Sequence, residues 1–296
     1  MKRPTLIVVV LAIAAFATFS QAQTSEVTSN ATEAYFRRGV ARYEQRDLDG
    51  AIKEFDRAIS IHTSSPVQIF EPGVAALYYN RGVVQYDLHN WDGALADLDK
   101  ALKIDPRYVM AWIKRGNTAI NKGDLIQAIA DFSRAISLDS SSTMAWNNRG
   151  LARQTKGELD AALTDYARAL ELDPRLVSAL NNRAGIKEER GDLQGALADY
   201  NQAIALDSEM ALLYCNRGLT RKALGDLNGA IADYTEAIRL RPNLNVAYFN
   251  RSAAWKAMGR GAEAEQDFIR SMAPGELPDL AVQPPIARAP AKPSKP

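Results

Sequence analysis

The sequence predicts an all-α protein made of about seven copies of one helical hairpin. A small residue recurs along the chain, and after a first interval of 43 residues every further interval is 34. An alanine follows each small residue by 12 positions, a Phe, Tyr or Leu follows by 16, and another small residue follows by 19. Intervals of four and seven place side chains on one stripe of a helix. The first small residues of the repeats are Gly39, Gly82, Gly116, Gly150, Ala184, Gly218 and Ser252.

Each repeat is expected to hold two helices joined by a short turn. The first helix carries an aromatic residue or leucine four positions before the small residue. Turns such as Gly123-Asp124 and Gly157-Glu158 follow, in which glycine ends one helix in the left-handed conformation and the acid caps the next. Pro106 and its equivalents end the second helix, because proline lacks the N–H that would continue it. We expect repeats at about residues 32–65, 75–108, 109–142, 143–176, 177–210, 211–244 and 245–274.

This order of aromatic, Gly, Ala, aromatic, Ala and Pro in a 34-residue helix-turn-helix resembles the tetratricopeptide repeat, over about residues 32–274. The resemblance implies a right-handed superhelical solenoid whose first helices line a concave, peptide-binding groove. The sequence departs from the pattern at an insertion over about residues 66–74, and at Arg46 and His89, which occupy the turn position where glycine is usual. Departures cluster at the two ends, so we expect the first and seventh repeats to be frayed or capping elements.

The two ends of the chain differ in composition from the repeats. Lys2 and Arg3 precede an apolar run of 14 residues that ends before Ser20-Gln21-Ala22, a pattern typical of a cleaved secretory signal over residues 1–22. We therefore expect an exported product, periplasmic or secreted, that contacts a membrane only if the signal stays uncleaved. Residues 275–296 contain six prolines and almost no apolar run, which predicts an extended, flexible tail.

Composition argues against several classes of function. The chain has 36 Lys plus Arg and 35 Asp plus Glu, so its net charge of +1 argues against a nucleic-acid partner bound by bulk charge. Two histidines and one cysteine exclude an internal disulfide framework and leave few residues for nucleophilic or metal chemistry. The adjacent acids Glu188 and Glu189 are expected to be solvated. We expect no catalytic residue, no metal and no cofactor.

Polar residues recur at one position of the repeat, which we call the asparagine column, and their recurrence requires an explanation. Asparagine lies two positions before the small residue in five of seven repeats, although it is a poor helix former. The family resemblance implies that these amides pair with the backbone of an extended peptide. The alternative is that they bond to the adjacent hairpin or to water. The column and a neighbouring amide supply the candidate peptide-binding residues Asn80, Lys114, Asn117, Asn148, Asn182, Asn216 and Asn250.

The amide ladder would hold a peptide only weakly by itself. Five amides at about 0.5–1.5 kcal/mol each give about 2.5–7 kcal/mol, before an ordering cost of about 1 kcal/mol or more per peptide residue. Specific binding therefore needs neighbouring side chains. The residues beside the ladder are Met110, Ile113, Asn117, Met144, Asn147, Asn181 and Cys215.

Lys114 and Asn117 with Asn148 resemble part of a family device that clamps a terminal carboxylate. The lysine stands one position from its place in that device, and the next repeat lacks the basic pair. The sequence therefore does not predict a clamp.

An arginine stands immediately before the small residue in all seven repeats, and an acid follows it by 16 residues. A constant offset between opposite charges predicts a salt bridge between the two helices of each hairpin, rather than a basic stripe for nucleic acid. Together these patterns predict a non-catalytic scaffold that binds an extended polypeptide in its concave groove. The alternative is an assembly subunit that uses its convex face and its termini within a larger exported complex.

Overall fold

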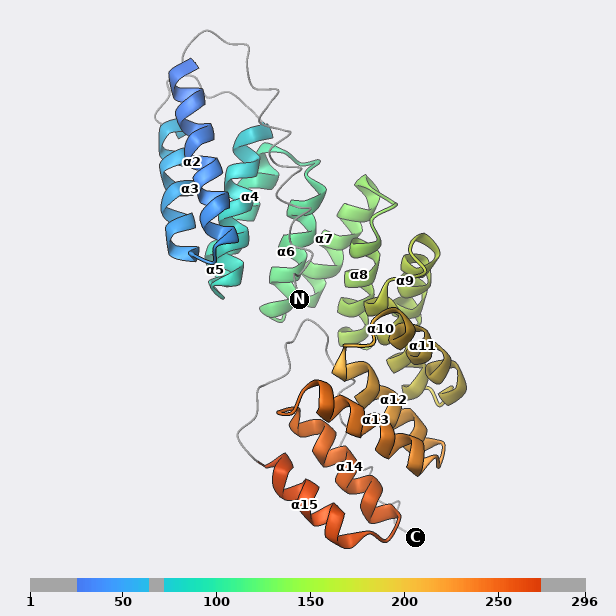
Figure 1. The fold of residues 1–296 in the computed structure, drawn as a ribbon. Helices are drawn as coiled ribbons and strands as arrows, with labels where there is room; N and C mark the ends of the chain where they lie inside the picture. The colour runs from blue at the N-terminus through green and yellow to red at the C-terminus, as the bar shows by residue number, and fades with distance from the viewer. Residues whose placement is uncertain (1–25, 64–71, 273–296) are drawn as a thin grey trace. The chain divides into compact units, whose positions relative to one another are not determined.

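The computed structural model describes residues 26–63 and 72–272. The predicted signal over 1–22, most of the insertion and the tail over 275–296 lie outside the described residues. Within the described ranges the chain is all-helical, with 14 α-helices and no strand, which confirms the predicted fold class (Figure 1). None of the described helices combines the length and apolar composition that crossing a membrane requires.

The chain divides into two compact parts, residues 1–156 and residues 157–296, each of which is described by itself. Helix α2 begins ahead of the expected start of the first repeat at residue 32. The helices of the N-terminal part are α2 (Glu26–Glu44), α3 (Leu48–Thr63), α4 (Pro72–Asp87), α5 (Trp91–Ile104), α6 (Val109–Asn121), α7 (Leu125–Leu138) and α8 (Thr143–Lys156). The helices of the C-terminal part are α9 (Leu159–Leu172), α10 (Val177–Glu189), α11 (Leu193–Leu206), α12 (Ala211–Ala223), α13 (Leu227–Leu240), α14 (Asn245–Ala257) and α15 (Gly261–Ser271).

The helices pack as hairpins that stack on one another. In the N-terminal part α2 pairs with α3, α4 with α5 and α6 with α7, and each second helix then packs on the first helix of the next hairpin. The C-terminal part repeats this order from α10 to α15, with α9 against α10. Successive first helices also touch, as α4 touches α6 and α12 touches α14. A hairpin therefore buries its apolar stripe against its neighbours, as expected for a repeat that is not stable alone.

Turn chemistry largely follows the sequence prediction. Gly123 adopts a φ of 81°, and the turn positions without glycine, Arg46 and His89, also take positive φ, at 65° and 59°. The side chain of Asp124 accepts a hydrogen bond from the Gln127 backbone N–H at 3.0 Å and caps α7. The expected cap by Glu158 is wrong, because its side chain makes no capping hydrogen bond at the start of α9. Glutamate is one methylene longer than the residues that prefer this position.

Small residues let aromatic rings pack against backbone. A Cβ added at Gly116 would lie 2.7 Å from the Phe132 ring, and one at Gly218 would lie 2.7 Å from the Tyr234 ring. Phe132 and Tyr234 are fully buried, as is Ala128 one turn before Phe132. The predicted stripe is thus the packed core, and it leaves the opposite faces of the first helices available to present other side chains.

Candidate functional site

The arginine column is part of the scaffold. Arg115 on α6 holds Asp131 on α7 through two hydrogen bonds, Nε to Oδ2 at 2.9 Å and Nη2 to Oδ1 at 2.6 Å. Its third contact is Asp99 on α5, in the preceding hairpin, at 2.6 Å, and its guanidinium stacks 4.7 Å above the Trp112 ring. One arginine therefore joins three helices. The predicted bridge is confirmed for Arg38–Glu54, Arg81–Asp97, Arg115–Asp131, Arg183–Asp199, Arg217–Asp233 and Arg251–Asp267.

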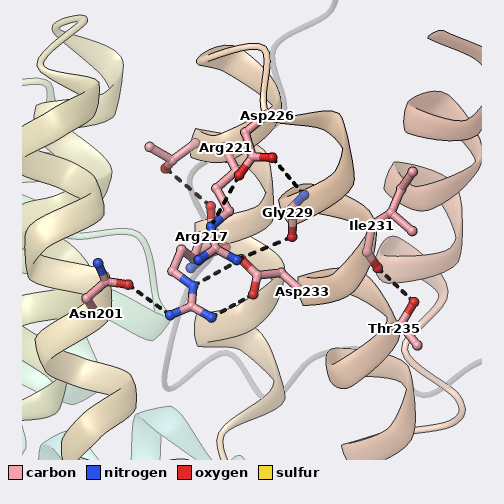
Figure 2. Close-up of polar contacts among 10 residues, drawn as sticks. Asn201, Arg217, Arg221, Asp226, Gly229, Ile231, Asp233 and Thr235 are labelled. Carbon is pink, nitrogen blue, oxygen red and sulfur yellow. Dashed lines mark hydrogen bonds and ion pairs between the residues drawn. The ribbon is translucent and has the colours of Figure 1, made fainter. Parts of the chain in front are cut away.

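Figure 2 shows the same arrangement in the C-terminal part. Arg217 binds Asp233 at 2.6 Å and also donates to Asn201 of the preceding hairpin at 2.8 Å. Arg221, one turn further along α12, binds the same Asp233 at 2.9 Å. The acid is therefore paired with two cations, and it is 3% exposed. Charges arranged in this way are neutralised within the chain and are not offered to a ligand.

Arg183 departs from this scheme. The position that holds Asp99 or Asn201 in other repeats is Ala167 here, and the aromatic position is Leu180. Among the described residues Arg183 therefore keeps Asp199 as its one hydrogen-bond partner. Lys187 joins the same acid, with 2.8 Å from its Nζ to Oδ2. Among the described residues, this arginine thus lacks the cross-repeat hydrogen bond that is made by Arg81, Arg115, Arg149, Arg217 and Arg251.

The asparagine column in the C-terminal part lies where successive first helices meet. The Asn216 amide donates to Asn181 at 2.9 Å, and the Asn250 amide lies 3.7 Å from the Cys215 sulfur. Asn181 donates in turn to Asn182 at 3.3 Å. Asn216 is only 1% exposed, whereas Asn182 and Asn250 are each 8% exposed. Asn216, Asn181 and Asn182 thus form a buried chain of hydrogen bonds between α12 and α10, and Asn250 makes a separate contact from α14 to α12.

In the N-terminal part the column is more open. Asn80 is buried and donates to the Ala76 carbonyl, one turn back on α4, at 2.7 Å. Asn148 on α8 is half-buried and donates to Asn117 on α6 at 2.9 Å, so two predicted site residues meet across adjacent helices. Lys114, also half-buried, lies on the same helix as Asn117, three positions earlier. Lys114, Asn117 and Asn148 therefore share one accessible surface.

Lys114 is a cation without an acid. Its Nζ lies 4.5 Å from the centre of the Tyr86 ring, and within the described ranges no carboxylate lies within ion-pair distance of it. Burial lowers the pKa of Lys114, and the charge of Asp87 opposes that shift. The Tyr43 hydroxyl donates a hydrogen bond of 2.6 Å to the Asp87 carboxylate, so this acid is already engaged. A desolvated, unpaired ammonium on an accessible helix face is the strongest polar feature of this surface.

Further polar groups surround that ammonium, and sequence reasoning missed them. Asn121 donates to the Tyr86 hydroxyl at 2.9 Å. Asp87 follows Asn80 by seven positions, and Asn121 follows Lys114, which occupies the same position of the next repeat, also by seven. Seven positions are two helical turns, and this offset is the signal that could have found both residues. We call the following residues the lysine cluster: Tyr43, Tyr86, Asp87, Lys114, Asn117, Asn121 and Asn148.

The residues expected beside the ladder divide into core and surface. Ile113 and Cys215 are each 2% exposed and pack within the core. Met144, on α8, is 45% exposed. The expectation that Glu188 is solvated is wrong: it is half-buried on α10, while its neighbour Glu189 is exposed. Across the described ranges, no group of three or more His, Cys, Asp and Glu side chains is arranged to hold a metal ion.

Comparison with known families agrees with this architecture. Models of the tetratricopeptide repeat match residues 75–108, 144–176 and 211–244, residues 111–142 and residues 11–66, and a TPR repeat model matches residues 188–225. These matches together span most of the chain, which belongs to the tetratricopeptide repeat family. Proteins with this repeat fold are generally scaffolds for protein–protein interaction. Among curated proteins, no match to this chain is found.

Solved structures share the fold at low sequence identity. A tetratricopeptide repeat protein from Parabacteroides merdae is 19% identical with a TM-score of 0.66, over 82% of this chain and 92% of its own. PilF of Pseudomonas aeruginosa is 17% identical with a TM-score of 0.64, over 78% and 99%. PilW, a type IV pilus biogenesis factor, is 20% identical with a TM-score of 0.61, over 66% and 90%. Identities this low support the fold alone.

Proposed function

We propose that this protein is a non-catalytic scaffold that binds an extended polypeptide segment on the face of its first helices, with the lysine cluster as the main contact. The observation that carries the proposal is the half-buried ammonium of Lys114, which has no acid partner among the described residues. An ammonium offers three donors and no acceptor. The oxygen of a peptide carbonyl or carboxylate is the complement that this position lacks.

The amide ladder takes a narrower part in binding than its recurrence implies. Because Asn216 is 1% exposed and donates to Asn181, it serves to hold α12 against α10. Asn117 accepts from Asn148 through its oxygen, and this leaves its own amide N–H groups for a ligand beside Lys114. We therefore assign direct contact to Lys114, Asn117 and Asn148, and we assign alignment of the first helices to Asn216 and Asn250. Asn80 and Asn182 take part in hydrogen bonds within their own helices.

The proposal is tested by selecting binders from a random peptide display library on the full chain. The comparison is Lys114→Met against Lys103→Met, which removes the same charge from an exposed position on α5. Loss of one charge-assisted hydrogen bond, about 1.5–3 kcal/mol, should remove most selected peptides from the Lys114 variant. Equal recovery by both variants, with unchanged helical circular dichroism, would place the binding surface elsewhere.

A second candidate function rests on the last hairpin. Phe249, Phe268, Ile269 and Met272, on or just beyond α14 and α15, are 53%, 41%, 64% and 70% exposed. Phe132, which occupies the same repeat position as Phe268 in an earlier hairpin, is fully buried. This apolar end surface favours an assembly subunit, on which a helical hairpin of another subunit stacks. Sedimentation of Phe249→Asp and Ile269→Asp variants tests it: a smaller complex supports assembly, and an unchanged one argues against it.

Export is also a proposal, supported by the charged start, the apolar run and the small residues of residues 1–22. N-terminal sequencing of the protein isolated from its source tests it. A mature chain that starts near Gln23 in the exported fraction supports export, and a full-length intracellular chain contradicts it.

A further inference from the structure

A second unpaired charge lies on the first helices of the C-terminal part. Glu188, near the end of α10, is half-buried, and across the described residues no lysine or arginine lies within ion-pair distance of its carboxylate. The preceding residue, Lys187, is bound to Asp199 at 2.8 Å and is therefore not available. The polar contact to Glu188 comes from Thr220 on α12, whose hydroxyl lies 3.2 Å from Oε2.

That contact is incomplete. The Thr220 hydroxyl also lies 3.3 Å from the Asn216 carbonyl, and it has one proton to donate. Elsewhere in this part the buried acids Asp199 and Asp233 are each held by two cations, Asp199 by Arg183 and Lys187 and Asp233 by Arg217 and Arg221. Glu188 is thus a carboxylate taken partly out of water that has hydroxyl donors beside it but no cation among the described residues to compensate its charge.

Two buried hydroxyls lie beside this carboxylate. Tyr200 on α11 and Tyr234 on α13 are fully buried, and both are near enough to Glu188 for its charge to act on them. The Tyr200 hydroxyl is close enough to Glu188 to act as a hydrogen-bond donor to it, whereas the Tyr234 hydroxyl has no hydrogen-bond partner among the described residues. Packing does not require these hydroxyls, because the Phe132 ring lies as close to Gly116 as the Tyr234 ring lies to Gly218: a Cβ added at either glycine would be 2.7 Å from the ring. An unpaired buried hydroxyl costs about 1–3 kcal/mol.

We propose that Glu188, supported by Tyr200 and Tyr234, is a binding site for an alkylammonium group, such as the lysine side chain of a bound polypeptide. An ammonium has three donors, and the site offers a carboxylate and two hydroxyl oxygens as acceptors. A guanidinium fits less well, since it prefers both oxygens of a carboxylate and Oε2 already accepts from Thr220. The apolar stem of a lysine can cover the helix surface while its head reaches Glu188.

As far as it concerns a lysine of the partner, this inference rests on the proposed function. The site itself can be tested without a partner. NMR signals of ¹³C-labelled tyrosine rings are followed while n-butylammonium chloride is added to the full chain. Tetramethylammonium chloride, which has the same charge but no N–H donor, serves as the control salt. Glu188→Gln removes the charge, and Glu189→Gln is the matched control at the exposed neighbour.

The expected result is a saturable shift of the Tyr200 and Tyr234 signals with butylammonium only. Glu188→Gln should weaken it about tenfold or more, the change that one lost charge-assisted hydrogen bond produces, and Glu189→Gln should leave it unchanged. Equal responses to both salts, or an unchanged response in Glu188→Gln, would overturn the proposal. Among selected library peptides, lysine should be enriched for the wild type and not for Glu188→Gln. Butylammonium binding without any selected peptide would retain the site and reject the proposed function.

Discussion

Replacing Arg115 by Met tests the claim that the arginine column is structural. The change leaves Asp131, which is 1% exposed, with the Gln127 amide at 2.7 Å as its remaining side-chain partner among the described residues. Removing one partner of a buried ion pair costs about 3–5 kcal/mol, because the other charge stays buried and uncompensated. The bond to Asp99, which is 61% exposed, adds at most about 1 kcal/mol. The lost stacking on Trp112 adds about 0.5–1 kcal/mol.

The measurement is urea unfolding of the full chain followed by circular dichroism, with hydrogen exchange of the α6 and α7 amides as a local readout. The expected loss for Arg115→Met is about 3.5–7 kcal/mol, centred on these two helices. The double variant Arg115→Met with Asp131→Leu removes both charges and should lose less than the single variant. A single-variant loss below about 1 kcal/mol, or a larger loss in the double variant, would refute the reasoning.

Three further outcomes follow from particular contacts. Ala167→Asp should give Arg183 its missing cross-repeat acceptor and raise the free energy of unfolding by about 0.3–1 kcal/mol; a decrease measured by urea unfolding would contradict this. Gly116→Ala should destabilise by about 1–3 kcal/mol, because its Cβ would lie 2.7 Å from the Phe132 ring; an unchanged midpoint would show that the ring can move away. Burial raises the pKa of Glu188 above its ordinary 4.5, so its charged form is disfavoured in the folded state. The free energy of unfolding should therefore fall as the pH rises through the range between the pKa of Glu188 in the unfolded chain and its higher pKa in the folded chain. Glu188→Gln should therefore be more stable than the wild type above that range and not below it, as thermal unfolding against pH can check.

The repeat pattern was enough to predict the hairpins. The interval of 34 residues and the stripe that includes Ala128 and Phe132 determine which side of each helix is buried, since a helix buries the face on which its apolar residues recur. Turn positions followed as well, including Arg46 and His89 at positive φ. Local propensity and packing favour the same structure in these elements, and for this reason a single sequence was enough to predict them.

The candidate site was only partly predictable, for a physical reason. The partner of Asn216 is Asn181, a residue of the preceding repeat, so the fate of its amide depends on how closely α10 and α12 approach. A pattern within one repeat does not contain that distance. Glu188 was misjudged in the same way, because its burial comes from its neighbours and not from its own helix. Lys114 was already a candidate binding residue from the sequence, but its lack of an acid partner among the described residues became visible only in three dimensions.

The central claim is that Lys114 on the first-helix face contacts a bound polypeptide. The most direct measurement is the affinity of one library-selected peptide for the wild type, Lys114→Met and Lys103→Met, by fluorescence polarisation at fixed salt. The account predicts binding about tenfold weaker or worse for Lys114→Met, and binding within about twofold of the wild type for Lys103→Met. Equal affinity for all three proteins, each with full helical circular dichroism, would contradict it.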